Sequence, residues 1–423
     1  MWESLATTPR QDRLLHGAAK ALNLVVGFLA APLWLLGQRL SDPFRRLLAR
    51  FDAQPVPVPM PQPRERSMDA LMSDLEAIPN GLHHSELAMV RKGLADLSTF
   101  VLANQREAAN LGYAYPGQFS DHVFEGADGE RIAASVGLQE GCGRPGLIVV
   151  HGLFSSRRFD YVRQIAVRAY YEWGFNVLAL DLRSFGLTNL TSEAPTTVGW
   201  KEGEDILALA RYMKELGSTS VGTLGISLGA SSVLGASHPE GAAERLDGGI
   251  LAVSPPADPE LAWQRLAEPV PRGHPRYPLH AGFQAALTSR VRSGRWPAEA
   301  EDMSRVMEVV SAPFYGVPAE EIWRRARGMD YMEKVRTPLL ILHPEDDQIV
   351  KVEHARMLEE ASRQNEMVRV WILPAGQHGI LEAIDPVWTY GVYRAFFERW
   401  ATYVERGALP SGSKLVYSAS QTG

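Results

Sequence analysis

The sequence predicts an α/β fold, in which a mostly parallel sheet of eight strands carries helices on both of its faces. Short β-rich runs alternate with helical patterns from about residue 147 to residue 373, which is typical of βαβ units. Two earlier runs flank Ala127-Asp128-Gly129, a turn sequence that predicts an antiparallel hairpin. A serine between two glycines, in Gly225-Ile226-Ser227-Leu228-Gly229, stands where a strand pattern gives way to a helix pattern.

The expected strands are short runs rich in β-branched and other apolar residues. They cover residues 119–124, 131–137, 147–150, 175–181, 221–226, 250–253, 339–342 and 368–373. Helical patterns separate the last six, and a helical crossover makes consecutive strands parallel.

Composition narrows the possible classes of protein. With 423 residues, of which 45% are hydrophobic and 22% charged, the chain can bury a large core. Its single cysteine, Cys142, excludes an intrachain disulfide. The sequence has no zinc or haem pattern, so no metal or cofactor is expected. A net charge of -6 argues against nucleic acid as a partner.

Residues 21–37 form an apolar run that is interrupted only by Asn23 and Pro32. As a helix the run would be roughly 26 Å long, at the short edge of what spans a bilayer. It predicts a membrane anchor that either spans the membrane or lies in its interface. The alternative is a helix that packs on its own domain or mediates a homodimer, and the oligomeric state stays open.

Residues 55–63 alternate proline with other residues, which excludes a helix and favours an extended spacer of roughly 28 Å. A stiff spacer suits an anchor and a domain that occupy different environments, and so it supports membrane association. Arginines are slightly more frequent after the apolar run than before it, which favours a main domain on the cytoplasmic side. A soluble cytoplasmic protein is the alternative.

Two amphipathic helices are expected between the spacer and the first strand, and both predict packing rather than chemistry. The apolar stripe of the first is Met68, Leu71, Met72, Leu75 and Ile78. That of the second is Leu87, Val90, Leu94, Leu97 and Val101. His83 and His84 precede the second helix without a carboxylate or cysteine at ligand spacing, and we interpret them as part of a solvated loop.

The glycine-flanked serine has the context of a nucleophile elbow. A serine held at a sharp turn from strand to helix needs neighbours that are almost without side chains, and Gly225 and Gly229 meet this need. A serine hydroxyl is a weak nucleophile and requires a neighbouring base. His378, on a glycine-flanked loop late in the chain, is the candidate base for Ser227.

Six short motifs occur in order along the chain: His151-Gly152-Leu153, Asp181-Leu182-Arg183-Ser184-Phe185-Gly186, the segment from Gly225 to Gly229, Ala312-Pro313-Phe314-Tyr315-Gly316, Glu345-Asp346-Asp347-Gln348-Ile349-Val350, and Gly376-Gln377-His378-Gly379. With them the chain resembles the α/β-hydrolase superfamily over about residues 119 to 404. Within that superfamily it is similar to the serine esterase and lipase-like proteins, and to the membrane-associated branch that includes the bacterial YheT-type hydrolases.

The resemblance implies a catalytic triad. Ser227 would be the nucleophile and His378 the base, and a carboxylate would hold the imidazole in the right tautomer. The family pattern places an aspartate just before one residue and an aliphatic pair, as in Asp347-Gln348-Ile349-Val350, so Asp347 is the expected acid. Because three acidic residues are consecutive here, Asp346 remains the alternative.

The resemblance also implies two backbone donors for the oxyanion that forms during acyl transfer, the N–H groups of Leu153 and Leu228. His151 and Asp181 are expected to brace loops, and His343 to be structural. An aspartate would replace Ser227 in a dehalogenase or an epoxide hydrolase, so both are disfavoured.

These features divide the chain into segments: a hydrophobic helix and possible anchor at 1–54, a spacer at 55–63, a helical extension at 64–118, a hydrolase core at 119–254 and 337–404, a lid insertion at 255–336, and a flexible tail at 405–423. The lid is rich in large apolar residues, which either line a pocket for an acyl chain or fill the lid's own core. Within it, several arginines, among them Arg290, predict a solvated basic face, and the alternative is a face that approaches anionic lipid headgroups.

The expected function is hydrolysis of carboxylic esters, on a small-molecule or lipid substrate with an acyl chain, through an acyl-enzyme. An acyltransferase, a thioesterase or a carbon–carbon hydrolase would use the same triad. The remaining alternative is a catalytically silent, membrane-tethered scaffold.

Overall fold

The computed structural model describes residues 65–85, 88, 114–140, 143–271 and 277–403. The predicted anchor at 21–37, the spacer at 55–63, all of the second amphipathic stripe from Leu87 to Val101, and the tail at 405–423 lie outside these residues and stay predictions. Within the described ranges, no helix has both the length and the apolar character needed to cross a bilayer.

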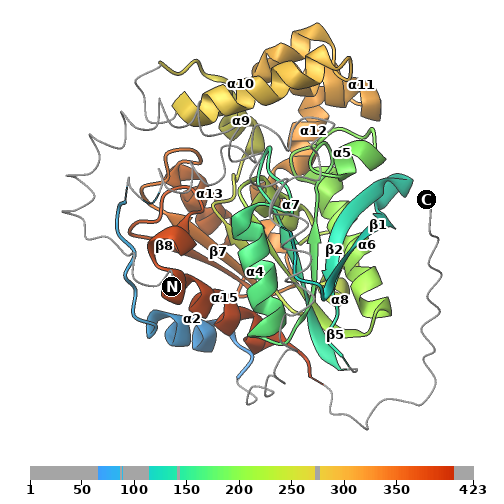
Figure 1. Cartoon of the computed structure of the whole chain (residues 1–423). Coiled ribbons are helices and arrows are strands. Elements are labelled where there is room, and N and C mark those ends of the chain that lie inside the picture. The colour runs from blue at the N-terminus through green and yellow to red at the C-terminus, as the bar shows by residue number, and fades with distance from the viewer. Residues whose placement is uncertain (1–64, 86–87, 89–113, 141–142, 272–276, 404–423) are drawn as a thin grey trace.

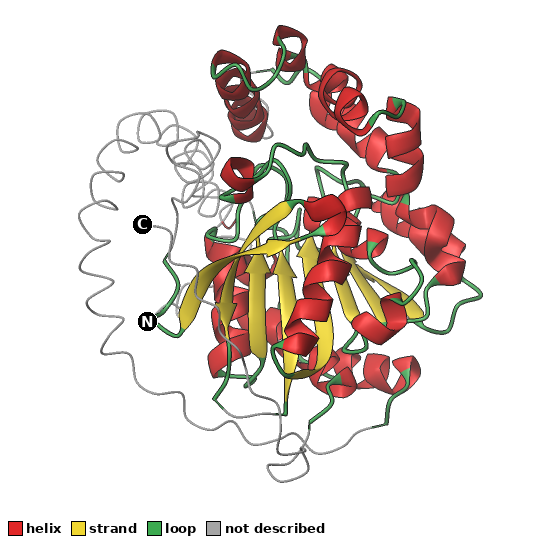
Figure 2. Ribbon diagram, turned by 90° about the vertical axis from the view of Figure 1, so that its right-hand side faces the viewer, coloured by secondary structure: helices red, strands yellow, loops and turns green. Residues whose placement is uncertain are grey.

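The described residues form one eight-stranded sheet, coloured yellow in Figure 2. Its strands are β1 (Phe119–Glu125), β2 (Arg131–Gly137), β3 (Arg144–Val150), β4 (Asn176–Leu180), β5 (Ser218–Ile226), β6 (Ile250–Val253), β7 (Leu339–Pro344) and β8 (Val368–Leu373). They lie in the order β1-β2-β4-β3-β5-β6-β7-β8 (Figure 1). The predicted mostly parallel sheet of eight strands is confirmed.

Strand direction decides where the loops of the sheet meet. β2 is antiparallel to both β1 and β4, and all other neighbours are parallel. The predicted hairpin is therefore present, and it turns through a short 3-10 helix at Ala127–Gly129. Because the carboxyl ends of parallel strands share one edge, the loops after β3 to β8 gather at that edge.

Helices cover both faces of the sheet (Figures 1 and 2). One face packs against α4 (Asp160–Tyr171), α15 (Pro386–Trp400) and α2 (Met68–Glu76), and the other against α6 (Trp200–Glu215), α7 (Leu228–Gly235), α8 (Ala242–Arg245) and α13 (Val352–Ser362). Side chains of β3 alternate between the two cores, since Leu147 and Val149 face the first group while Ile148 and Val150 face the second. Two short helices, α5 (Thr188–Thr191) and α14 (Leu381–Ile384), belong to loops.

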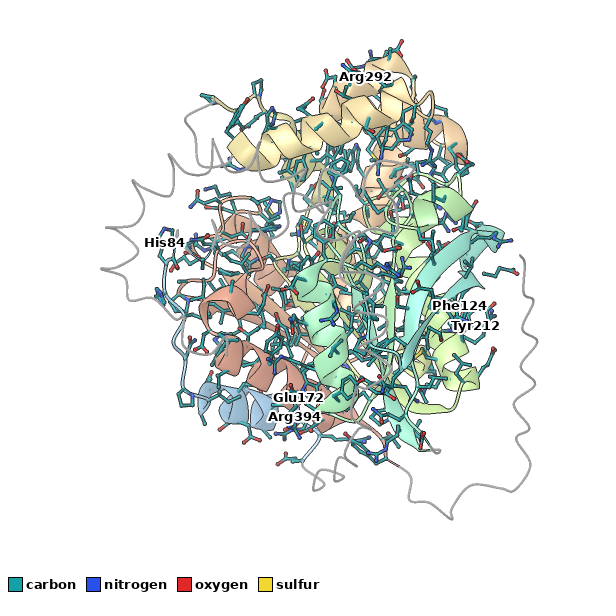
Figure 3. The ribbon with its side chains drawn as sticks, viewed as in Figure 1. His84, Phe124, Glu172, Tyr212, Arg292 and Arg394 are labelled. Atoms are coloured by element: carbon teal, nitrogen blue, oxygen red, sulfur yellow. The ribbon has the colours of Figure 1, made fainter. Side chains whose placement is uncertain are left out.

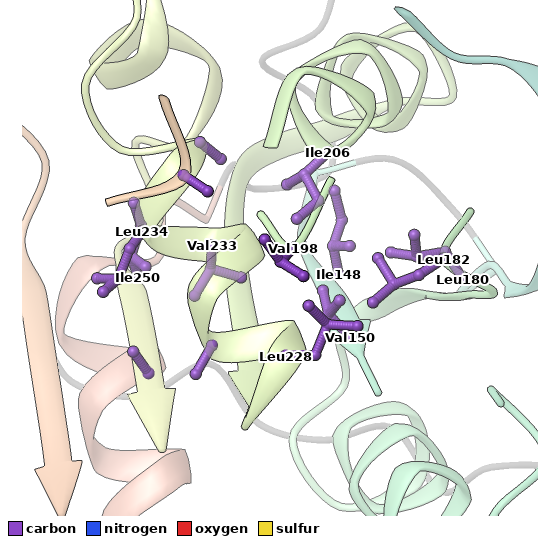
Figure 4. Packing of buried hydrophobic residues seen from close by; sticks show 14 of the residues in the cluster. Ile148, Val150, Leu180, Leu182, Val198, Ile206, Leu228, Val233, Leu234 and Ile250 are labelled. Atoms are coloured by element: carbon purple, nitrogen blue, oxygen red, sulfur yellow. The ribbon is translucent and has the colours of Figure 1, made fainter. Parts of the chain in front are cut away.

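Aliphatic side chains form the core behind the elbow. Ile148 and Val150 of β3 meet Val233 of α7 and Ile206 of α6, and all four side chains are buried (Figure 4). Burial of an aliphatic side chain of this size contributes about 1.5–3 kcal/mol. This packing fixes the start of α7 directly after β5. At the other end of the sheet, the ring of Phe124 on β1 lies 5.3 Å from that of Tyr212 on α6 (Figure 3).

The helix α2 is part of the same core, although it precedes the sheet by many residues. Ser67 caps its first turn by accepting a hydrogen bond from the N–H of Ala70. Leu71 and Leu75 are fully buried in the cluster that contains α15. Arg399 of α15 donates to the carbonyl oxygen of Glu65 at 2.6 Å and ties the segment down.

The insertion between β6 and β7 forms a helical layer above the carboxyl edge of the sheet (Figure 1). Its helices are α9 (Pro259–Ala267), α10 (Tyr277–Arg292), α11 (Ala312–Tyr315) and α12 (Ala319–Ala326), and a 3-10 segment at Gly328–Lys334 leads into β7. Most of its large apolar side chains are buried in one cluster with the sheet core: Trp263, Phe283, Met303, Met307 and Trp323. They fill the insertion's own packing, whereas Phe314 is 47% exposed.

Candidate active site

Ser227 occupies the turn between β5 and α7 in a conformation that L-residues rarely adopt. Its φ is 59° and its ψ is -118°, and such a backbone costs about 1–3 kcal/mol. A Cβ atom on Gly225 would lie 2.1 Å from the carbonyl oxygen of Gly229. A Cβ atom on Gly229 would lie 2.5 Å from the carbonyl oxygen of Val150. Both positions therefore require glycine, because α7 starts in contact with the backbones of β3 and β5.

We expect Gly225→Ala to prevent stable folding, since the new methyl group meets backbone atoms that cannot move aside. The midpoint of thermal unfolding, measured by calorimetry, should fall by many degrees, or no folded protein should be recovered. Gly391→Ala in α15 is the matched control, because its Cβ would approach only Ile78, at 3.9 Å. That variant should be neutral or slightly more stable, by up to about 1 kcal/mol. Equal stability of the two variants would contradict this account of the elbow.

The structure brings Ser227, His378 and Asp347 into one hydrogen-bonded chain. The distance from His378 Nε2 to Ser227 Oγ is 2.8 Å, and the distance from His378 Nδ1 to Asp347 Oδ2 is also 2.8 Å. The three residues come from the loops after β5, β8 and β7. With Nδ1–H donating to the carboxylate, Nε2 is left to accept the hydroxyl proton of Ser227. Ser227 and His378 are half-buried, while Asp347 is only 1% exposed.

The carboxylate of Asp347 is held in its charged form. Burial alone would raise its pKa, but the nearby rings of His378 and His343 and the N–H of Ile349 outweigh burial and hold the pKa below the ordinary value of 3.8. Its Oδ1 accepts the N–H groups of Ile349 at 2.8 Å and of Val350 at 2.9 Å. These bonds leave Oδ2 facing His378.

Asp346, the alternative acid, points elsewhere. Its Oδ1 accepts the backbone N–H of Gln377 at 2.7 Å, and its Oδ2 lies 2.8 Å from Nδ1 of His84. Asp346 thus contacts the residue before His378, whereas Asp347 contacts the imidazole itself.

The two expected oxyanion donors are the backbone N–H groups of Leu153, in the loop after β3, and of Leu228, at the start of α7. Leu228 is the first residue of α7, where a helix leaves its N–H groups without partners within the helix. Leu153 follows Gly152, and a Cβ on Gly152 would lie 3.4 Å from the Cβ of Ser227. In the described part of the chain, neither N–H donates to a backbone oxygen in the loops around the site. The N–H groups of Leu153 and Leu228 thus have no backbone acceptor there, and their role as oxyanion donors stays a prediction.

Buried hydrogen bonds fix the loop after β3. Gly152 donates its N–H to the hydroxyl of Tyr161 at 2.8 Å. His151 donates from Nδ1 to the carbonyl oxygen of Gly152 at 2.7 Å and accepts the N–H of Leu182 on Nε2 at 2.9 Å. Asp181 is buried beside Arg157 and accepts the N–H of Arg157 at 2.7 Å. His151 and Asp181 thus brace the loops, as the sequence predicted.

His151 and His343 predict how stability depends on pH. Burial lowers the pKa of both imidazoles below the ordinary value of 6.5, so they stay neutral in the folded protein. Below pH 6.5 the unfolded chain takes up protons that the folded chain does not, and the free energy of unfolding falls. The loss amounts to at most about 1.4 kcal/mol per pH unit for each histidine.

Calorimetry between neutral pH and about pH 5 measures this loss as a falling midpoint of unfolding. His343→Gln should reduce the slope, because the amide does not titrate in that range. A midpoint independent of pH over this range would contradict the prediction.

The insertion between β6 and β7 packs on the loop after β3. The ring of Phe283 on α10 lies 5.0 Å from that of Phe154, the residue after Leu153. Arg290, expected on a solvated basic face, is instead 2% exposed and lies over the rings of Phe154 and Phe185. Burial lowers its pKa to about 9. A guanidinium tolerates such a place because it is weakly hydrated and stacks on aromatic rings.

Two hollows of the described residues lie apart from the group formed by Ser227, His378 and Asp347. One hollow of about 180 Å³ is lined by Trp200, Glu204, Gly235, His238, Pro239, Arg325 and Tyr331. A larger one of about 510 Å³ lies between the β1–β2 turn, α6 and the region of α8. Neither is lined by Ser227, His378 or Asp347. In the same part of the chain, no group of three or more histidine, cysteine or acidic side chains could hold a metal ion.

Comparison with known proteins identifies the family. A profile of the alpha/beta hydrolase family matches residues 147–389, more than half of the chain. The chain belongs to the alpha/beta hydrolase family. This agrees with the strand order and with the position of Ser227 after β5.

Individual proteins that are similar to this chain include an esterase and two peptidases. The esterase Pf2001 of Pyrococcus furiosus is 20% identical, with a TM-score of 0.49 over 69% of this chain and 96% of its own. A puromycin-hydrolyzing peptidase of Mycobacterium tuberculosis is 17% identical, with a TM-score of 0.48 over 67% of this chain and 40% of its own. The uncharacterized peptidase YtmA of Bacillus subtilis is 33% identical over 82 residues, which are 19% of this chain and 31% of that protein.

Three residues at the site escaped the sequence analysis. Tyr161 belongs to none of the six motifs, and Gln377 lies within one of them but was given no role of its own. His84 was assigned to a solvated loop, but its ring bonds to Asp346, 262 positions away. No local pattern indicates a contact between residues so far apart, so only the fold reveals it.

Proposed function

We propose that this alpha/beta hydrolase is a serine esterase that cleaves carboxylic esters through Ser227, His378 and Asp347. The observation that carries the proposal is the pair of 2.8 Å hydrogen bonds that join the three side chains. Acyl transfer requires a serine hydroxyl, a base that takes its proton and a carboxylate that orients the base. The serine on the strained turn, the imidazole with one orientation and the buried carboxylate match these three groups. Within the family, we place the chain with the lipase-like and YheT-type hydrolases that its motifs resemble.

In the proposed reaction, Ser227 Oγ attacks the acyl carbon while His378 Nε2 takes the hydroxyl proton. Asp347 stabilises the imidazolium that results. The N–H groups of Leu153 and Leu228 bind the oxyanion. Collapse of the tetrahedral intermediate breaks the ester C–O bond, and His378 returns the proton to the departing alcohol. Water then attacks the acyl-enzyme by the same steps and releases the acid.

Hydrolysis of amides is the second candidate, and the local match to the peptidase YtmA favours it. A peptide bond has a poorer leaving group than an ester, so its cleavage depends more strongly on proton donation from His378. The same triad can cleave an ester or an amide bond. A comparison of ester and amide substrates therefore decides between the two candidate functions.

A matched substrate panel tests the proposal. We would measure kcat/KM on p-nitrophenyl esters from acetate to palmitate, on the corresponding thioesters, and on p-nitroanilides of the same acids. A fluorophosphonate probe would report the reactive serine. We expect labelling and the highest kcat/KM on esters. Faster cleavage of anilides would make the protein a peptidase or amidase, faster cleavage of thioesters would make it a thioesterase, and a chain that is neither labelled nor active would be a scaffold.

We also propose that residues 21–37 attach the enzyme to a membrane and are not needed for the chemistry. The full chain should sediment with membranes or require detergent. A chain starting at Arg64 should be soluble and should keep its kcat on a short-chain ester, because it retains α2 and all candidate catalytic residues. Sedimentation and kcat of the two chains check this prediction. A full chain that is monodisperse without detergent would show that the apolar run packs within the protein.

A further inference from the structure

Residues 81–85 and Ala88 pack against the loop that carries His378. Gly81 donates its N–H to Oδ2 of Asp385 at 2.8 Å. Ala88 and Leu82 form a small apolar cluster with Ile380 and Ile384, which follow His378 closely in the chain. The segment lies outside the 147–389 region that the family profile covers. This part of the chain thus adds a support for the histidine loop from outside the matched region.

His84 forms the polar end of this contact. Its Nδ1 lies 2.8 Å from Oδ2 of Asp346, whose other oxygen accepts the N–H of Gln377 at 2.7 Å. The ring is 54% exposed and the carboxylate 18% exposed. His84 is on the same side of the molecule as α13 and β8 (Figures 1 and 3). A continuous series of hydrogen bonds therefore joins His84, through Asp346, to the residue that precedes His378.

Gln377 needs such support because its backbone is strained. Its φ is 51°, in the left-handed region that a residue with a side chain adopts at a cost of about 1 kcal/mol or more. This conformation sets the direction in which the next residue projects. Asp346 also adjoins Asp347 in sequence, so one carboxylate connects the turn of the acid to the loop of the base.

We propose that His84 and Asp346 are positioning residues, which hold His378 in line with Ser227 by fixing the backbone of Gln377. His84 Nδ1–H orients the carboxylate of Asp346, and the carboxylate holds the strained loop. Neither residue contacts the reacting atoms. The inference rests on the proposed function, because it concerns the base of that same reaction.

Steady-state kinetics of the full chain on a p-nitrophenyl ester tests the inference. His84→Ala should lower kcat about three- to tenfold, the usual effect of one hydrogen bond, and leave KM unchanged, since the substrate is not touched. The rate of fluorophosphonate labelling should fall by the same factor. His84→Asn should restore both rates, because its amide N–H can replace Nδ1–H. His83→Ala is the matched control and should behave as the unsubstituted chain, since it removes the neighbouring imidazole and leaves the contact between His84 and Asp346 in place.

A double-mutant cycle separates positioning from packing. Asp346→Ala should lower kcat about tenfold, and adding His84→Ala should cause no further loss, because both act through the same bond. Losses that multiply, or a His84→Ala variant with the kcat of His83→Ala, would overturn the inference. A change in thermal stability without a change in kcat would do the same.

Failure of the proposed function has a different signature. If the unsubstituted chain is not labelled, or if Ser227→Ala is labelled equally, the esterase proposal fails and the positioning inference fails with it. If the unsubstituted chain is labelled and the His84 and Asp346 variants keep its kcat and its labelling rate, the esterase proposal stands and the inference alone is wrong.

Discussion

Replacing Ser227 with alanine is expected to lower kcat on p-nitrophenyl esters by about a million-fold, and to abolish labelling by a fluorophosphonate probe. In the proposed mechanism the Oγ atom forms the acyl-enzyme, and no other hydroxyl shares its contact with His378 Nε2 within the described residues. His378→Ala should cause a similar loss, because the nucleophile and its base act as a unit. Kinetics and probe labelling of the purified variants measure both effects.

Ser231→Ala is the matched control for this prediction. Ser231 lies one turn further along α7, and its buried Oγ has no hydrogen-bond partner among the described residues. The control should therefore keep the full kcat and the full labelling. The thermal midpoint of Ser227→Ala should stay close to that of the unsubstituted chain, since alanine removes only a half-buried hydroxyl. Undiminished labelling of Ser227→Ala would show that the nucleophile is another residue.

Asp347→Asn is expected to lower kcat by about 10⁴-fold. The amide preserves the shape of the side chain, but its NH₂ group cannot accept the Nδ1–H of His378. The imidazole then adopts the tautomer that carries its proton on Nε2, where it cannot take the proton of Ser227. The loss should appear in kcat, with the fold and the thermal midpoint largely retained.

Asp346→Asn tests the choice between the two aspartates. Its remaining oxygen can still accept the N–H of Gln377, so we expect at most about a tenfold loss. A larger loss at position 346 than at position 347 would identify Asp346 as the acid of the triad.

Much of the fold follows from local sequence patterns. The apolar runs of β3 to β7 mark buried strands. Gly225 and Gly229 mark the turn at Ser227, because neighbouring backbone atoms come so close there that only glycine fits. Strand ends were less accurate. β3 begins at Arg144 rather than at Leu147, since its backbone pairs with β5 from Ser218 onward whatever side chains it carries.

Contacts that the tertiary structure creates could not be predicted. Glu345, Asp346 and Asp347 are consecutive, and only the path of the turn decides which carboxylate meets His378. Arg290 has the sequence context of a solvated face, but α10 turns it onto Phe154 and Phe185. The contact between His84 and Asp346 likewise depends on the fold, because 262 positions separate the two residues.

The separation of Ser227 from His378 by 151 positions has a consequence for synthesis on the ribosome. Strands β3 to β6 can emerge and pair while the loop that carries the histidine is still untranslated. The helix α2, made near the beginning, must wait for α15 before Leu71 and Leu75 can be buried. In a nascent chain Ser227 therefore lacks its hydrogen bond to His378 through most of elongation, and the contact forms only after β8 and α15 have left the exit tunnel and docked.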